Sequence, residues 1–219
     1  ETNFFKFALY VSFFPQLLAG PIERAKSLIP QFHFNYSFEY NRVVGGLRIV
    51  LWGLFKKTVI ADRMATYTNP IFENPENIFG LDIWFASILF CFQIFCDFSS
   101  YSDIAIGIAR VMGINLSKNF GNRPYIAKSY VDHWSMTHIT LSKWLRDYFF
   151  IPFFSRSKIF SVYSGIFITM IVCGLWHGAS TTFILWGAFH GIGIILGQKY
   201  TMPIKSILKR IIFLISSII

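Results

Sequence analysis

Long apolar stretches dominate this sequence, and most charged residues lie between them. A helix needs about 17 to 25 residues to cross the hydrocarbon core of a bilayer, which is about 30 Å thick. Five stretches meet this requirement and a sixth begins near the end of the sequence; they are residues 4–20, 43–61, 78–96, 159–176, 181–197 and 204–219. The pattern predicts an all-α fold, a polytopic bundle of membrane helices.

The segment 115–158 breaks this pattern, because it is too polar and too often interrupted to cross a membrane. Its last part, SKWLRDYFFIPFF (residues 142–154), mixes charged and aromatic side chains as interfacial helices do. We expect this segment to lie along the cytoplasmic face or to re-enter the membrane from it. No low-complexity linker divides the sequence, so we expect one membrane domain over residues 1–219, truncated at both ends.

Composition supports the membrane interpretation: 54% of the residues are hydrophobic, 19% are aromatic, 14% are charged, and the mean hydropathy is +0.50. The net charge of +9 does not indicate a nucleic-acid partner, because the basic residues are spread through loops beside apolar stretches. Basic loops face the cytoplasm in membrane proteins. We therefore expect two cytoplasmic segments, 115–158 and 198–210, with the basic residues Lys118, Arg123, Lys128, Lys143, Arg146, Arg156, Lys158, Lys199, Lys205, Lys209 and Arg210.

Cysteine and histidine spacing predicts no metal site. The three cysteines have no CxxC spacing and lie in or beside apolar stretches, which favours reduced packing residues. His133 and His138 are five residues apart and His177 and His190 thirteen, so on a helix each pair is turned by about 140° and shares no face. His33 lies in a polar and aromatic loop, and we expect no role for it.

Two carboxylates, Asp97 and Asp103, follow directly on the apolar stretch 78–96. One interpretation is structural: Asp97 or Ser99 caps a new helix that starts there, and Asp103 lies in its first turn. The alternative is that both carboxylates line a cavity inside the bundle, because a carboxylate that faces lipid is costly. The sequence leaves both alternatives open.

His177 lies between two apolar stretches, in CGLWHGAS (residues 173–180). A neutral imidazole can accept a proton from a hydroxyl, and burial favours the neutral form. Gly174 and Gly178 would let a substrate or another helix come close, while Trp176 and Trp186 would form chamber walls or part of an aromatic belt. The residues alone allow either a catalytic His177 or one that is packed and hydrogen-bonded.

Four motifs resemble the membrane-bound O-acyltransferase family, in its bacterial branch of alginate O-acetyltransferases and teichoic acid D-alanyltransferases. They are FFPQLLAGPIER (13–24), FQIFCDFSSYSDIAIGIARVMGINLSKNFGNRPYIAKS (92–129), HITLSKWLRDYFFIP (138–152) and GLWHGASTTFILWGAFHG (174–191). The motifs occur in the order that the family shows. The third motif contains the first characteristic histidine of the family and the fourth contains the second.

The resemblance implies transfer of an acyl group, acetyl in the first place, from a thioester to hydroxyls of a cell-surface polysaccharide. His177 matches the histidine taken as catalytic, and His138 matches the other one. The residues expected to line the substrate sites are Trp176, Asn119, Trp144, Arg146, Asp97 and Asp103. No bound cofactor is implied; the donor would be acyl-CoA or an acyl carrier protein.

The resemblance also implies a multi-pass protein of the bacterial cytoplasmic membrane. Its partners would be membrane lipid, the acyl donor, and a polysaccharide or an extracytoplasmic protein that accepts the acyl group. Two spans between cytoplasmic segments would form a hairpin whose turn lies near His177, so that donor and acceptor approach from opposite sides. Alternatives are D-alanyl transfer within the family, or a non-enzymatic transporter or scaffold in which the carboxylates and histidines form a path.

The chain departs from the family pattern at several positions. Ser100 stands where relatives have glycine, and HWSMT (residues 133–137) replaces a Phe-Trp-Arg-Arg-Trp motif, so Ser135 and Met136 remove a basic pair that could contact the donor. Family members are roughly twice as long as this sequence, and we expect helices at both ends of the chamber to be missing.

Overall fold

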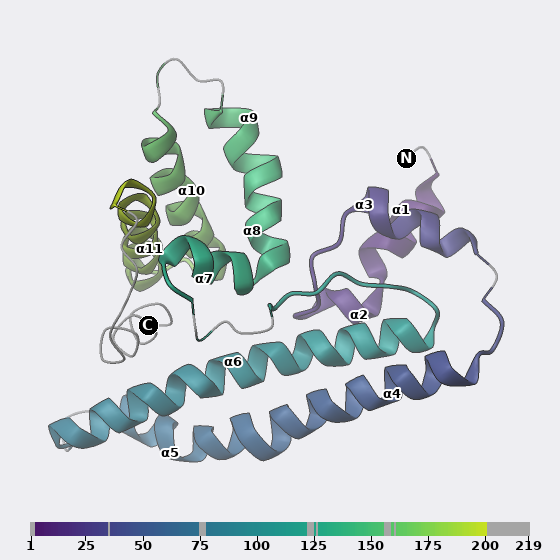
Figure 1. Cartoon of the computed structure of the whole chain (residues 1–219), viewed down its shortest axis with the longest axis horizontal. Helices are drawn as coiled ribbons and strands as arrows, with labels where there is room; N and C mark the ends of the chain where they lie inside the picture. The colour runs from purple at the N-terminus through teal and green to yellow at the C-terminus, as the bar shows by residue number, and fades with distance from the viewer. Residues whose placement is uncertain are drawn as a thin grey trace. The chain divides into compact units, whose positions relative to one another are not determined.

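A computed structural model describes residues 3–34, 36–74, 78–121, 125, 127–155, 159 and 161–200 (Figure 1). The described residues are helical, with no strand among them, which confirms the all-α prediction. The chain divides into two compact units, residues 1–119 and 120–219. The predicted stretch 204–219 lies outside the described residues.

The first unit begins with short helices around a small apolar core. These are α1 (Phe4–Ser12), α2 (Phe14–Leu17), α3 (Ala25–Leu28) and the 3-10 helix η1 (Ile29–His33). Phe13 and Leu28 pack together with Ala109 and Ile114. The expectation of one span over 4–20 is wrong, because the backbone is extended at Phe13 and the next helix starts there with proline in its first turn.

Two long helical segments lie side by side in the same unit (Figure 1). The first combines α4 (Tyr40–Phe55), the π-helical segment η2 (Lys56–Ala61) and α5 (Asp62–Glu73), and the second is the 32-residue helix α6 (Gly80–Val111). A Cβ atom on Gly46 would lie 2.7 Å from the carbonyl oxygen of Gly107, and one on Gly53 would lie 2.9 Å from that of Ser100. Small residues therefore allow the two backbones to approach closely, as in packed membrane helices.

Helix α6 corrects one prediction. One of the two alternatives was that Asp97 or Ser99 caps a new helix, but α6 continues through both residues without interruption. The polar side chains have partners on the neighbouring segment, so they require no helix end there. The proposed cap at Asp97 is therefore wrong.

The second unit contains three short helices and a helical hairpin. The short helices are α7 (Tyr130–Met136), α8 (Ile139–Leu145) and α9 (Ile151–Phe154), with the π-helical segment η5 (Arg146–Phe150) between the last two. The hairpin is formed by α10 (Val162–His177) and α11 (Thr181–Tyr200). Ser161 caps α10 by accepting a hydrogen bond from the Ser164 amide at 3.2 Å.

Two described helices, α6 and α11, are long and apolar enough to cross a membrane, and α10 is apolar but shorter. Only 17% and 22% of the residues in the apolar windows of α6 and α11 are buried. Most residues of these windows are therefore exposed or half-buried in the part of the chain that the structure describes, which is compatible with contact to lipid or to further helices. The number of spans and the interfacial position of 115–158 stay predictions.

Candidate active site

His177 is the last residue of α10, and the turn of the hairpin follows it at once (Figure 1). A Cβ atom on Gly174 would lie 2.1 Å from the carbonyl oxygen of Phe183, and one on Gly187 would lie 2.3 Å from that of Met170. The predicted hairpin and the predicted close approach at Gly174 are confirmed. The short turn fixes His177 between the ends of two packed helices.

His138 lies where α7 gives way to α8, and its backbone is left-handed, with φ 44° and ψ 47°. Among the described residues it is the one non-glycine residue with positive φ. Its carbonyl oxygen accepts hydrogen bonds from the Ser142 amide at 3.0 Å and from the Ser142 hydroxyl at 3.2 Å. A conformation this uncommon outside glycine is often found where a functional side chain must point in one direction.

The two histidines that match the family motifs face each other. Their ring centroids are 6.4 Å apart, and the Trp176 ring lies 6.0 Å from His138 and 5.0 Å from His177. Three predicted site residues are thus brought together, although His138 and His177 are 39 positions apart in the sequence. A hydroxyl placed between the rings would meet two imidazoles able to accept or donate a proton.

The two rings differ in exposure. His138 is half-buried, and burial lowers its pKa to about 3, with the charge of nearby His177 acting in the same direction. His177 is exposed, which corrects the expectation that it is buried. Its place at the tip of a hairpin leaves one side of its ring uncovered, so a substrate can reach it.

Aromatic side chains hold the other side of the His177 ring. Trp186 packs against it edge to face at 5.1 Å between centroids, and Phe183 is stacked at 6.3 Å. The two alternatives for Trp186, a chamber wall or part of an aromatic belt, both stay predictions. Phe183 and Trp186 lie on α11, which therefore contacts the His177 ring of α10.

Two residues of this cluster, Trp134 and His190, were not among the predicted site residues. His190 is fully buried, its Nδ1 accepts a hydrogen bond from Trp134 Nε1 at 3.1 Å, and its ring lies 4.4 Å from that of Trp186. The spacing of Trp186 and His190 at i and i+4 was a usable signal, because it places both on one face of α11. The meeting with Trp134, 56 positions away, leaves no local signal in the sequence.

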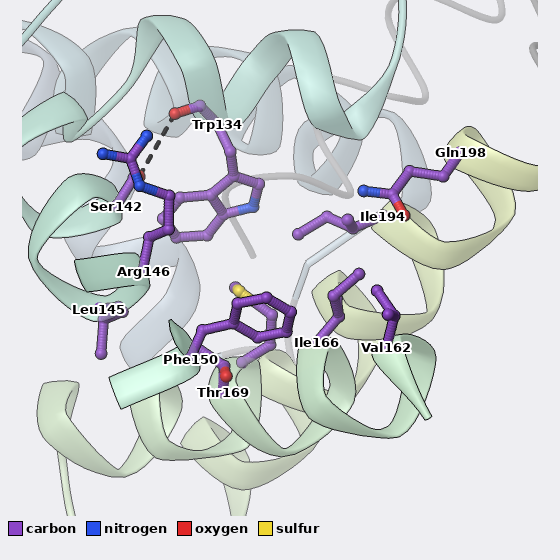
Figure 2. Close-up of a pocket in the computed structure, with 11 residues that line it drawn as sticks. Trp134, Ser142, Leu145, Arg146, Phe150, Val162, Ile166, Thr169, Ile194 and Gln198 are labelled. Atoms are coloured by element: carbon purple, nitrogen blue, oxygen red, sulfur yellow. Dashed lines mark hydrogen bonds between the residues drawn. The ribbon is translucent and has the colours of Figure 1, made fainter. Parts of the chain in front are cut away.

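An apolar pocket of about 310 Å³ lies in the second unit, lined by residues of α7, α8, η5, α10 and α11. Figure 2 shows Trp134 from α7 and Phe150 from η5 among the side chains that line it, with Arg146 and Gln198 as its charged and amide groups. Neither histidine of the facing pair lines the pocket. The link is Ser142, which lines it and whose hydroxyl lies within hydrogen-bond distance of two carbonyl oxygens, that of His138 at 3.2 Å and that of Trp134 at 3.3 Å, and can donate to one of them at a time.

The other predicted residues of this segment are placed differently. Arg146 lines the pocket, and its Nε donates to Asp147 Oδ1 at 2.7 Å, with 60% of its side chain exposed. Trp144 is exposed and stacks on Tyr148 at 5.4 Å between centroids. Arg146 therefore lines a pocket. Trp144 does not line it and instead contacts a neighbouring aromatic ring.

The first unit contains three of the predicted residues, Asp97, Asp103 and Asn119. Lys57 Nζ lies 2.7 Å from Asp97 Oδ1, and Lys56 Nζ lies 2.9 Å from Asp103 Oδ2. Asn119 is buried and donates from its side-chain amide to the Ser102 hydroxyl at 3.3 Å. The carboxylates thus pair with lysines of η2, a use that the sequence analysis did not consider.

Among the described residues, no group of three or more histidine, cysteine or acidic side chains is arranged to hold a metal ion. The three cysteines, Cys91, Cys96 and Cys173, are all buried. Packing is the role that this placement supports.

The chain belongs to the membrane-bound O-acyltransferase family, whose model matches residues 1–206. This confirms the resemblance noted in the sequence motifs. Family membership also assigns the chain to a class of membrane-bound proteins, in agreement with the long apolar helices α6 and α11.

The chain is similar to two proteins that are named as enzymes of O-acetyl transfer. The chain is 41% identical to the peptidoglycan O-acetyltransferase of Helicobacter pylori, over 91% of this chain and 38% of the relative. It is 36% identical to the "Probable alginate O-acetylase AlgI" of Pseudomonas aeruginosa, over 99% of this chain and 43% of the relative. The teichoic acid D-alanyltransferase of Streptococcus thermophilus is 28% identical, over 93% of this chain and 52% of the relative. The chain therefore spans about half or less of the length of these relatives.

Proposed function

We propose that this chain forms the histidine-containing part of an O-acyltransferase that moves an acetyl group from a thioester to hydroxyls of a cell-envelope polysaccharide. The observation that carries the proposal is the pair of facing imidazoles, His138 and His177, whose centroids are 6.4 Å apart. Family membership supplies the reaction class, and the pair supplies groups suited to that reaction. A transporter in which histidines form a path would also bring two imidazoles together, so the reaction class of the family is what favours acyl transfer.

In the proposed mechanism His177 accepts the proton of the acceptor hydroxyl while the oxygen attacks the thioester carbonyl. The carbon–sulfur bond then breaks, and the leaving thiolate takes up the proton. A general base of this kind is worth about 100- to 10,000-fold in rate. His138, which burial keeps neutral, offers one hydrogen-bond donor and one acceptor beside the reacting atoms.

The acyl group and the acceptor follow from the relatives. The two relatives with 41% and 36% identity are named for O-acetyl transfer, and the D-alanyltransferase is more distant at 28%. Acetyl is therefore the acyl group we propose, with D-alanine as the alternative. The acceptor is a polysaccharide of the envelope, or an extracytoplasmic partner protein that passes the group on.

The donor is an acyl-CoA or an acyl carrier protein, which reaches the site from the cytoplasm. The apolar pocket beside Ser142 would take the donor arm, and the guanidinium of Arg146 would meet its anionic part (Figure 2). Trp144 is a weaker proposal for the same side. The full-length protein would act as a multi-pass protein of the bacterial cytoplasmic membrane, where a closed chamber limits hydrolysis of the thioester.

The test measures ester-linked acyl groups on surface polysaccharide from cells that carry the full-length protein. Wild type is compared with His177→Ala, Asp103→Ala and the control His33→Ala, with membrane levels of each variant checked. His33 is a fair control because it belongs to the first unit and its Nδ1 lies 3.1 Å from the Ile29 carbonyl oxygen. We expect His177→Ala to lose at least about 100-fold in ester content and His33→Ala to retain it.

Mass spectrometry of the released acid identifies the group, and D-alanine in place of acetate would correct that part of the proposal. Normal esters in His177→Ala, at normal protein level, would remove His177 from the chemistry. If Asp103→Ala lost transport or esters as fully as His177→Ala at equal protein level, the transporter or scaffold alternative would move ahead.

A further inference from the structure

His190 makes no direct contact with the paired histidines among the ring contacts described, yet it is fully buried within the same aromatic cluster. Its ring lies 4.4 Å from Trp186, and Trp186 lies 5.1 Å from His177. The Tyr130 ring lies 5.6 Å from that of His190, edge to face. Burying an imidazole completely is costly unless its polar atoms are hydrogen-bonded, so a purely apolar residue would fill this position more cheaply.

The hydrogen bond to Trp134 fixes the chemical state of His190. An indole N–H can only donate, so the Nδ1 atom that accepts it at 3.1 Å carries no proton. His190 is therefore either the neutral tautomer protonated at Nε2, or it loses this bond. The bond also ties α11 to α7, the short helix that leads directly into His138.

Trp186 lies between the two imidazoles on this side of the hairpin. Trp134 packs edge to face against it at 5.9 Å, and the Trp134 ring lies 5.4 Å from His190. The rings of Trp134, Trp186 and His190 pack against one another. This packing holds Trp186 in its edge-to-face contact with His177. A shift of His190 or Trp134 would therefore move the surface on which His177 rests.

We propose that His190 is a positioning residue for acyl transfer, which together with Trp134 holds Trp186 against His177 and so fixes the direction of the His177 ring. This inference rests on the proposed function, because it assigns a purpose to the orientation of His177. It predicts that loss of His190 lowers turnover and leaves substrate affinity nearly unchanged.

The variants separate the hydrogen bond from the bulk. His190→Asn keeps an acceptor oxygen near the position of Nδ1, whereas His190→Leu fills much of the space without an acceptor. Trp134→Phe removes the donor from the other side. The control is Thr68→Val in the first unit, where the hydroxyl of the fully buried Thr68 has the Gln93 side-chain oxygen and the Met64 carbonyl oxygen as its possible acceptors.

In the full-length protein we expect kcat to fall about 10- to 100-fold in His190→Leu, with KM changed less than about threefold, since small misplacements of a catalytic group cost this much. His190→Asn should recover most of the loss. The double variant with Trp134→Phe should be no worse than the poorer single variant, because both act through one contact. Equal activity of His190→Leu and wild type, while His177→Ala is inactive, would overturn this inference and leave the proposed function standing.

A second readout does not need activity. In protein labelled with ¹⁵N-histidine, the His177 resonance is identified by its loss in His177→Ala. It should shift in His190→Leu and Trp134→Phe and stay in place in Thr68→Val. An unshifted resonance in His190→Leu would contradict the inference, whatever reaction the protein catalyses.

Discussion

At the scale of single residues, His138 carries two constraints that a free histidine does not have. Its backbone is left-handed, and its ring is half-buried against Trp176 and His177. Both constraints cost free energy, the first because Cβ crowds the backbone and the second because burial opposes charge. These costs agree with the role beside the reacting atoms that we propose for His138.

The burial of the α7–α8 histidines predicts a loss of stability in acid. The pKa of His133 is lowered to about 4 and that of His138 to about 3, in both cases mainly by burial, with Asp132 opposing the shift at His133. Unfolded histidine has a pKa of about 6.5. As the pH falls below this value the unfolded chain binds protons that the folded chain does not, so stability drops by roughly 1.4 kcal/mol per pH unit for each residue.

We therefore expect the unfolding temperature of the full-length protein in detergent to fall steadily from pH 7 to pH 4.5. His133→Leu should show a shallower decline, and His33→Ala should follow the wild type. Scanning fluorimetry across this pH range measures the difference. Parallel curves for His133→Leu and wild type would show that His133 is not protected from protonation.

At the scale of secondary-structure elements, the hairpin of α10 and α11 is held by backbone contacts. Gly174 and Gly187 each face a carbonyl oxygen of the opposite helix, at distances where a Cβ atom has no room. The helices meet through small residues and not through interlocking large ones, which is how membrane helices commonly pack.

Adding a methyl group at these glycines should separate the helices. We expect Gly174→Ala and Gly187→Ala each to lower stability by about 1 to 3 kcal/mol, because overpacking forces the backbone to move. Gly80→Ala is the matched control, since nothing lies within 4 Å of its added Cβ atom and alanine favours a helix. Unfolding temperatures in detergent decide the matter, and equal values for all three variants would refute the close packing.

Ion pairs between lysines of η2 and carboxylates of α6 join these two elements. Lys56 is buried; its Nζ donates to the Ser99 hydroxyl at 2.7 Å and pairs with Asp103. Removing one member leaves the other charge in a poorly solvated place, which typically costs about 3 to 5 kcal/mol, whereas removing both is often tolerated.

Accordingly, Lys56→Met and Asp103→Leu should each destabilise the full-length protein more than the double variant does. Asp62→Asn serves as the control, because Asp62 pairs with Lys57 at 2.8 Å but has nearly half of its side chain exposed, so about 1 kcal/mol or less is expected. Denaturation of all four variants tests the pair. A double variant as unstable as the sum of the single variants would show that the charges do not depend on each other.

At the scale of the whole molecule, the sequence predicted the helical class and the α10–α11 hairpin well, because long apolar stretches between Gly and Ser residues leave few alternatives. It left two alternatives open at Asp97, a helix end or a cavity wall, and considered neither of the lysine partners that lie some 40 positions earlier. It also missed His190, since the hydrogen bond to Trp134 depends on two segments meeting in space. Local patterns specify elements, and tertiary contacts decide what polar residues inside them do.

The hairpin also predicts which ends are reached from which side of the membrane. Helix α10 runs from Val162 to His177, about 24 Å at 1.5 Å per residue, and Ala179 lies in the turn that follows it. In a background without the buried native cysteines, Ala179→Cys should react with an impermeant maleimide from outside the cell, and Val162→Cys only after permeabilisation. Labelling of both from the same side would contradict the proposed orientation.

Helix α6 is longer than the hydrocarbon core of a bilayer is thick. Its 32 residues extend about 48 Å, whereas the hydrocarbon core measures about 30 Å. As a membrane span, a helix this long would tilt strongly or project beyond the acyl chains. We expect its apolar first half to lie in the hydrocarbon core, and the half from Asp97 onward, which pairs with the lysines of η2, to lie closer to the headgroup layer.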